Sequence, residues 1–290
     1  MSRPCIARER PSCCTRRGAT TPDPLSGILH GTYAFLGVAD FWSREWPAAG
    51  RGAELTYART VRQLHVGLDI LRESTDLTPT GSALVPALGA EISRLPVTGL
   101  AADIRRLADD LVAHHRALWR LRQVEPDPAE VAALADDWLR GGPVGSFAAP
   151  DDRATTTTAP GGDSPLFRLA TAWVENPDAV RAAAADPIAF DARYPDADPL
   201  DAPLVAGDYA EAQTTRLAGC APDENAWASL SVAHGRLCGD PARSPLATRP
   251  ELVRAAWPQV AELTGAATNP LAELVSRYVA GTSTSDSMRR

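Results

Sequence analysis

Lysine is absent from the 290-residue chain, so all 29 basic residues are Arg. They are outnumbered by 36 acidic residues, and the formal net charge at pH 7 is −7. Because nucleic-acid binding needs a basic stripe that neutralises phosphates, this balance argues against a nucleic-acid partner. No apolar run approaches the roughly 20 residues that cross a bilayer. The sequence therefore predicts a soluble, cytoplasmic protein with no membrane partner.

Cysteine is scarce as well. There are five cysteines, an odd number, and Cys5, Cys13 and Cys14 crowd into the N-terminal segment. Cys13 and Cys14 are adjacent and lack the C-x-x-C spacing of a zinc or redox site. Together with Cys220 and Cys238, they are predicted to be free thiols in a reducing compartment rather than a disulfide framework.

The local motifs of common enzyme classes are also missing. The chain contains no G-x-G-x-x-G or G-x-x-x-x-G-K-[ST] phosphate loop, no G-x-S-x-G elbow and no H-E-x-x-H metal motif. We conclude that this sequence does not by itself contain a complete catalytic site of these types.

What the sequence does contain is helical periodicity. Apolar residues recur at three- and four-residue spacing through the first half of the chain, which is typical of amphipathic helices. We expect helices there over about residues 28–46, 53–73, 78–95, 98–123 and 127–141. The first of these is apolar almost all round, which predicts that it is buried.

Capping and breaking residues mark several helix ends. Ser26 is the expected N-cap of the first helix, which should end at Pro47 and the glycine turn at residues 50–52. Asp127, followed by Pro128, is a good start for the fifth helix. Gly141 is its expected end.

The second half is predicted to be helical in shorter pieces. Residues 207–237 form two amphipathic segments around Pro222-Asp223, similar to one tetratricopeptide-like hairpin, and no repeat follows. Two further helices are expected, over about residues 248–264 and 268–280, and no strand is predicted.

The fold class expected is thus all-α, an antiparallel helical bundle followed by a smaller helical domain. We divide the chain into an aberrant or disordered segment 1–24, the bundle 25–142, a flexible linker 143–163, the second domain 164–281 and a disordered tail 282–290.

Among the five histidines, His30 is the strongest candidate for a functional role. His114 and His115 are adjacent and cannot easily share a metal, and Asp110 with His114 is expected on a solvated helix face. His234 is expected to be a packing or surface residue. His30 lies one turn into a very apolar helix, so it is either a core histidine bonded to a carbonyl or a metal ligand.

A family resemblance bears on this choice. The stretch PLSGILHGTYAFLGVADFWSREW, residues 24–46, is similar to a segment of the HExxH motif-containing peptide-modification proteins. These proteins occur alone or fused behind radical-enzyme maturases in ribosomal-peptide natural product biosynthesis. The likeness continues through ARTVRQLHVGLDILRESTDLTPTG, residues 58–81, and more loosely over most of residues 22–280.

The resemblance implies an iron(II)- and 2-oxoglutarate-dependent peptide β-hydroxylase. In that family a helix carrying H-E-x-x-H precedes the matching segment and supplies two iron ligands. The resemblance then implies that His30 is the third metal ligand. It also implies that Arg59 or Arg62 pairs with the distal carboxylate of 2-oxoglutarate, because Arg binds carboxylates bidentately.

Residues 1–24 contain no such motif where the metal helix is expected. We therefore predict an N-terminally truncated or mis-started family member, inactive alone, with a precursor peptide or partner maturase as its partner. Loss of the motif helix should leave apolar surface exposed on residues 28–46 and an empty slot beside His30. Two other hypotheses remain, a non-catalytic all-helical peptide- or protein-binding module and a degenerate remnant, and a sealed core around His30 would favour the binding module.

Overall fold

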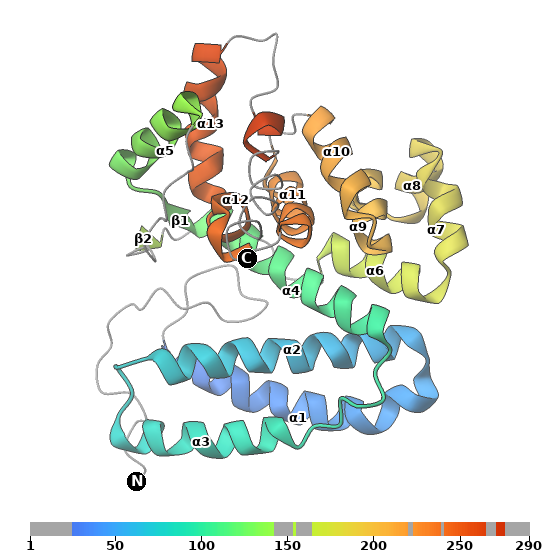
Figure 1. Ribbon diagram of the computed structural model, residues 1–290. Coiled ribbons are helices and arrows are strands. Elements are labelled where there is room, and N and C mark those ends of the chain that lie inside the picture. Colours follow the sequence, from blue (N-terminus) through green and yellow to red (C-terminus); the bar gives the residue numbers. More distant parts are fainter. Residues whose placement is uncertain are drawn as a thin grey trace, which may run out of the picture. The chain divides into compact units, whose positions relative to one another are not determined.

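The protein is all-α, as predicted, and its described residues include two very short strands (Figure 1). The computed structural model describes residues 25–141, 153–154, 164–219, 223–238, 241–264 and 271–275. The predicted segments 1–24 and 282–290 and most of the predicted linker lie outside these residues.

The first five helices have 13 to 25 residues, and the helices that follow have 4 to 15 residues. The helices are α1 (Leu25–Ala49), α2 (Arg51–Glu73), α3 (Pro79–Ser93), α4 (Ala102–Gln123), α5 (Pro128–Arg140), α6 (Pro165–Glu175), α7 (Pro177–Ala184), α8 (Pro187–Arg193), α9 (Ala202–Ala206), α10 (Tyr209–Gly219), α11 (Glu224–Leu237), α12 (Pro245–Thr248) and α13 (Pro250–Thr264). Single 3₁₀ turns are η1 (Pro199–Asp201) and η2 (Pro241–Arg243), and residues 271–275 are helical. The strands β1 (Val124–Glu125) and β2 (Arg153–Ala154), which the sequence did not predict, pair antiparallel.

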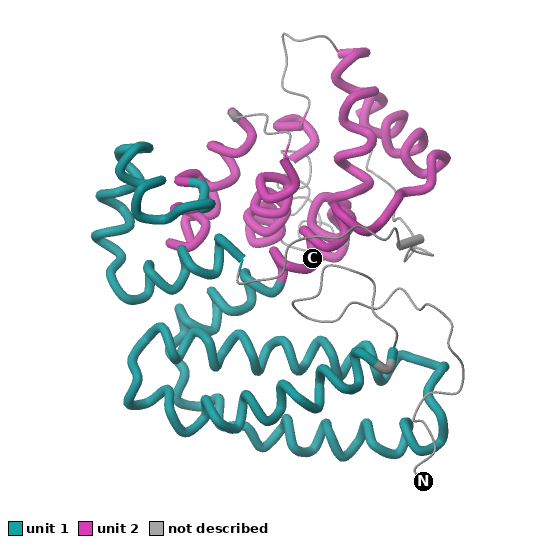
Figure 2. Tube along the Cα trace, turned by 180° about the vertical axis from the view of Figure 1, so that it is seen from behind, with its two compact units in different colours: residues 1–112, 156–198 teal, residues 113–155, 199–290 magenta. Residues whose placement is uncertain are grey.

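The chain divides into two compact units (Figure 2). Unit 1 comprises Met1–Val112 and Thr156–Asp198, and unit 2 comprises Ala113–Thr155 and Pro199–Arg290. The predicted domains are contiguous, whereas each unit takes chain from both sides of the predicted linker. Packing explains the difference, because α6 contacts α2 within unit 1 and α5 contacts α13 within unit 2.

Unit 1 is built around α2, which contacts α1, α3 and α6 (Figure 1). Two glycines let its neighbours approach closely. A Cβ on Gly67 would lie 2.6 Å from Oγ1 of Thr32 on α1. A Cβ on Gly52 would lie 2.6 Å from Oε1 of Glu175 on α6. A side chain at Gly67 would press against the short Thr32 side chain, whereas one at Gly52 would meet the end of the longer, flexible Glu175 side chain, which can move away.

Helix α1 is less buried than predicted, and it begins and ends at other residues than predicted. Tyr33 is 66% exposed and Phe41 is 55% exposed, so the prediction that this helix is buried all round is wrong. The helix begins at Leu25, ahead of the predicted N-cap Ser26, and continues through Pro47 to Ala49. A proline in the last turn is tolerated there, because only one helical hydrogen bond is lost so close to the end.

Unit 2 has its own hydrophobic core. The largest fully buried side chain in it is Trp138 of α5, which lies beside Trp257 of α13 at 6.1 Å between ring centroids. The predicted cap Asp127 accepts a hydrogen bond from the Ala129 backbone N–H at 2.8 Å. Gly141 ends α5 in the left-handed conformation at φ 72°. These end signals were predicted correctly because they depend on neighbouring residues alone.

Helices α10 and α11 contact each other as a hairpin around the predicted break. Asp223 caps α11 by accepting from the Ala226 backbone N–H at 2.9 Å. The two predicted helices are thus present, and a tetratricopeptide arrangement stays a prediction.

Candidate functional site

One face of α1 is exposed along its whole length and carries His30. We call it the His30 face, and it consists of His30, Tyr33, Ala34, Gly37, Asp40, Phe41 and Arg44. These positions follow the three- and four-residue spacing of one helical stripe. The opposite side of α1, with Ile28, Leu29 and Ala39, is buried. The interpretation of His30 as a core histidine is therefore wrong, because its side chain lies on the outer stripe rather than the packed one.

The two arginines that the resemblance singles out are engaged elsewhere within unit 1. The Arg59 guanidinium lies over the Phe167 ring of α6, 4.2 Å from its centroid. Arg62 donates from Nε to Oδ1 of Asp109 on α4 at 2.7 Å. The structure thus pairs them with residues of α6 and α4. A carboxylate ligand would compete with these contacts, and its binding there stays a prediction.

The residues around His30 do not by themselves fit the iron site that the resemblance implies. Such a site needs about three protein ligands. Across the described part of the chain, no group of three His, Cys, Asp or Glu side chains could hold a metal ion. His30 is the single ligand present on its face, apart from Asp40, which pairs with Arg44 at 2.5 Å.

The segment from Asp110 to His114 was predicted to be solvated and is buried instead. Asp110 is 1% exposed and accepts from Nη1 of Arg106 at 3.0 Å. His114 is 3% exposed, and its Nε2 is buried without a hydrogen-bond partner. Burial lowers the pKa of His114 to about 4, although a hydrogen bond to the Asn225 backbone opposes the shift. The spacing alone could not reveal this, because α4 is packed over more of its surface than an edge helix.

Unit 2 contains a buried chain of thiol, imidazole and amide. Sγ of Cys238 lies 3.2 Å from Nε2 of His234, and Nδ1 of His234 lies 3.1 Å from Oε1 of Gln213. This geometry is satisfied when Nδ1–H donates to the amide and Nε2 accepts from the thiol. The four-residue spacing of His234 and Cys238 was a readable signal that the sequence reasoning missed.

That chain resembles a nucleophile with its base, but its electrostatics oppose such a role. His234 is fully buried, and burial lowers its pKa to about 4. The imidazole therefore stays neutral at pH 7 and does not take the thiol proton. Cys238 is itself buried at the C-terminal end of α11, where the helix dipole disfavours a thiolate. We assign the three residues a structural role.

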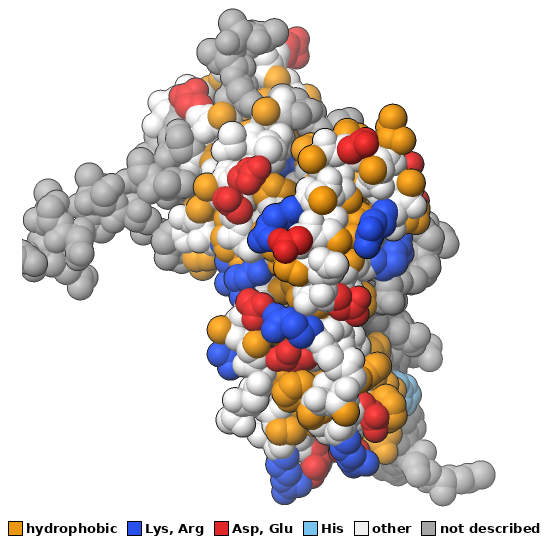
Figure 3. All heavy atoms as spheres, turned by 90° about the vertical axis from the view of Figure 1, so that its right-hand side faces the viewer, with side chains coloured by type: hydrophobic (Ala, Val, Ile, Leu, Met, Phe, Trp, Pro, Cys, Tyr) orange, Lys and Arg blue, Asp and Glu red, His pale blue; other side chains and the backbone are white. Residues whose placement is uncertain are grey.

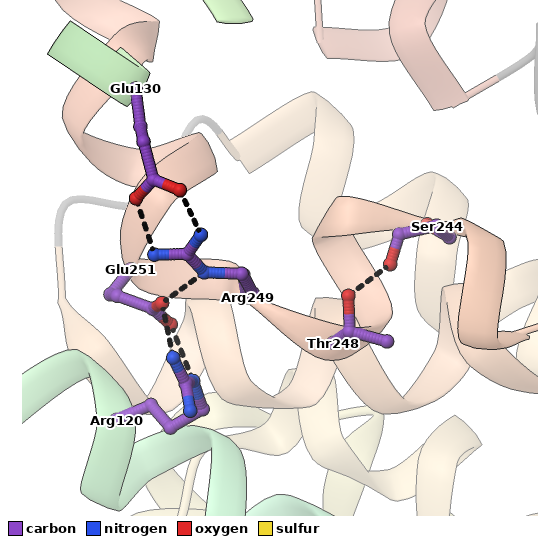
Figure 4. A network of polar contacts seen from close by, with 6 residues as sticks. All are labelled: Arg120, Glu130, Ser244, Thr248, Arg249 and Glu251. Carbon is purple, nitrogen blue, oxygen red and sulfur yellow. Dashed lines mark hydrogen bonds and ion pairs between the residues drawn. The ribbon is translucent and has the colours of Figure 1, made fainter. Parts of the chain in front are cut away.

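Four charged side chains form a network in the interior of unit 2 (Figure 4). Glu251 accepts from Nε and Nη2 of Arg120 at 2.9 and 2.7 Å. The same carboxylate accepts from Nε of Arg249 at 3.3 Å. Arg249 then donates from Nη1 and Nη2 to both oxygens of Glu130, each at 2.9 Å.

The network has no net charge and ties α4, α5 and α13 together. Arg120, Arg249 and Glu251 are each less than a tenth exposed, so their charges depend on one another for stabilisation. Burial alone would lower the pKa of Arg249, but the hydrogen bonds and charges of Glu130 and Glu251 raise it. A second buried pair joins Arg216 to Asp201 at 2.5 Å, and Ser229 donates to the same carboxylate at 2.7 Å.

Charges on the molecular surface are mixed in sign. On the face drawn in Figure 3, basic and acidic side chains alternate among apolar ones, and neither sign forms a continuous field among the residues drawn in colour. Among the described helices, none is long and apolar enough to cross a membrane.

Comparison of the chain with protein-family models, with curated proteins and with solved structures finds no match. The resemblance of residues 24–46 to the HExxH proteins therefore stays a prediction from the sequence.

Proposed function

We propose that the chain is an incomplete relative of the iron(II)- and 2-oxoglutarate-dependent peptide β-hydroxylases of ribosomal-peptide biosynthesis, without catalytic activity of its own. One observation carries this proposal. His30 is exposed on a helix face whose centre is apolar, with Tyr33 and Phe41 largely open. In the family that the sequence resembles, a neighbouring helix supplies two further ligands. An exposed histidine on such a face is what we expect if that helix is missing. A sealed core around His30 would have spoken against it.

The proposal is tested by supplying the missing ligands. Residues 1–24 are replaced by an amphipathic helix that carries His-Glu-x-x-His, and iron(II) is titrated anaerobically with 2-oxoglutarate present. We expect the grafted chain to retain about one iron per chain after desalting, because three ligands then become available. The original chain should retain none.

Two variants of the grafted chain make this test specific. His30→Ala should abolish retention, whereas His65→Ala, at a half-buried histidine of α2, should leave it unchanged. Circular dichroism checks that both variants keep their helices. Iron retention that survives His30→Ala, or a folded graft that retains no iron, would refute the proposal.

A second candidate function is a non-catalytic peptide- or protein-binding module. It is favoured by the engagement of Arg59 with Phe167 and of Arg62 with Asp109, because a bound carboxylate would have to displace these contacts. An exposed apolar face is a common mark of an interaction surface.

This candidate predicts binding that depends on apolar side chains and not on His30. The probe is the apolar dye anilinonaphthalene sulfonate, measured by fluorescence at high dilution. Phe41→Glu should remove most of the signal and His30→Ala should leave it. A signal that Phe41→Glu does not change would exclude the His30 face as the binding surface.

A further inference from the structure

We draw no further inference here: the strongest candidate, the exposed apolar stripe of α1 that runs through Tyr33, Gly37 and Phe41 on the His30 face, carries none because nothing in the described residues shows what covers it.

Discussion

At the scale of single residues, the burial and pairing of polar side chains are the features that the sequence predicts least. Arg249 and Glu251 flank Pro250, and no sequence pattern around them indicates that they are buried. They nevertheless join Arg120 and Glu130 in one interior network. Pairing between residues more than a hundred positions apart depends on tertiary packing, which no local pattern encodes. The bidentate geometry on Glu130 also requires Arg, since lysine offers a single ammonium.

Removing Glu251 should therefore be costly. Glu251→Gln leaves the Arg120 charge buried without its carboxylate, and we expect the free energy of unfolding to fall by about 3–5 kcal/mol. Urea denaturation measures this. The matched control is Glu91→Gln, which breaks an exposed pair with Arg94 and should cost no more than about 0.5 kcal/mol. Equal losses in the two variants would show that the interior network does not stabilise unit 2.

Two buried histidines should make the fold sensitive to acid. The pKa values of His114 and His234 are lowered from 6.5 to about 4 by burial. Between these values the unfolded chain binds protons that the folded chain does not. Stability is thus fully present above pH 6.5 and is lost as the pH falls from 6.5 toward 4.

The loss should reach roughly 3 kcal/mol for each histidine at pH 4. Urea denaturation between pH 7.5 and 4.5 measures the slope. His114→Gln removes one titrating group and should flatten the slope by about half. A variant slope equal to that of the original chain would mean that His114 is already protonated in the folded state.

Cys238 should be an inert thiol. It is buried and hydrogen-bonded to a neutral imidazole, so native-state alkylation by iodoacetamide should be at least about 100-fold slower than in urea. Peptide mass spectrometry resolves Cys238 from the other cysteines. Rapid native-state alkylation at Cys238 would instead identify an activated nucleophile and reopen a catalytic role for His234 and Gln213.

At the scale of elements, the sequence predicted the helix spans well, but it predicted poorly which sides of the helices are buried. The spans of α2 and α5, and the caps Asp127 and Gly141, follow from local spacing and turn chemistry. The burial of α1 does not, because an apolar helix shows no polar stripe to mark its outer side. The same limit left a core position open for His30 beside the metal-ligand hypothesis. Asp110 was predicted on a solvated face because its four-residue spacing to His114 is typical of an exposed helical pair, whereas tertiary packing buries it.

Glycines on helices α1 and α2 offer a direct comparison of packed and open positions. Gly67→Ala forces a methyl group toward Oγ1 of Thr32, and we expect a loss of about 1–3 kcal/mol in unfolding free energy. Gly37→Ala meets open space and should stabilise the monomer by up to about 1 kcal/mol. Urea denaturation at high dilution compares the two, and destabilisation by both would show that α1 is packed at Gly37 within one chain.

At the scale of the whole molecule, the chain order of the helices does not follow the units. A Pro-, Gly- and Thr-rich stretch predicts a boundary at 143–163, but each unit combines segments from before and after it. Contacts such as α6 with α2 set the division, and they are long-range. The function proposed here likewise depends on one surface, the His30 face, which the sequence identified only through the family resemblance of residues 24–46.

The measurement that tests the role of this surface most directly is the anaerobic iron(II) titration of the chain in which residues 1–24 are replaced by a helix carrying His-Glu-x-x-His. We predict that this grafted chain retains about one iron per chain after desalting, because the graft and His30 together supply three ligands. The His30→Ala variant of the grafted chain should retain none. A folded graft without iron, or iron retention that survives His30→Ala, would contradict the role proposed for the His30 face.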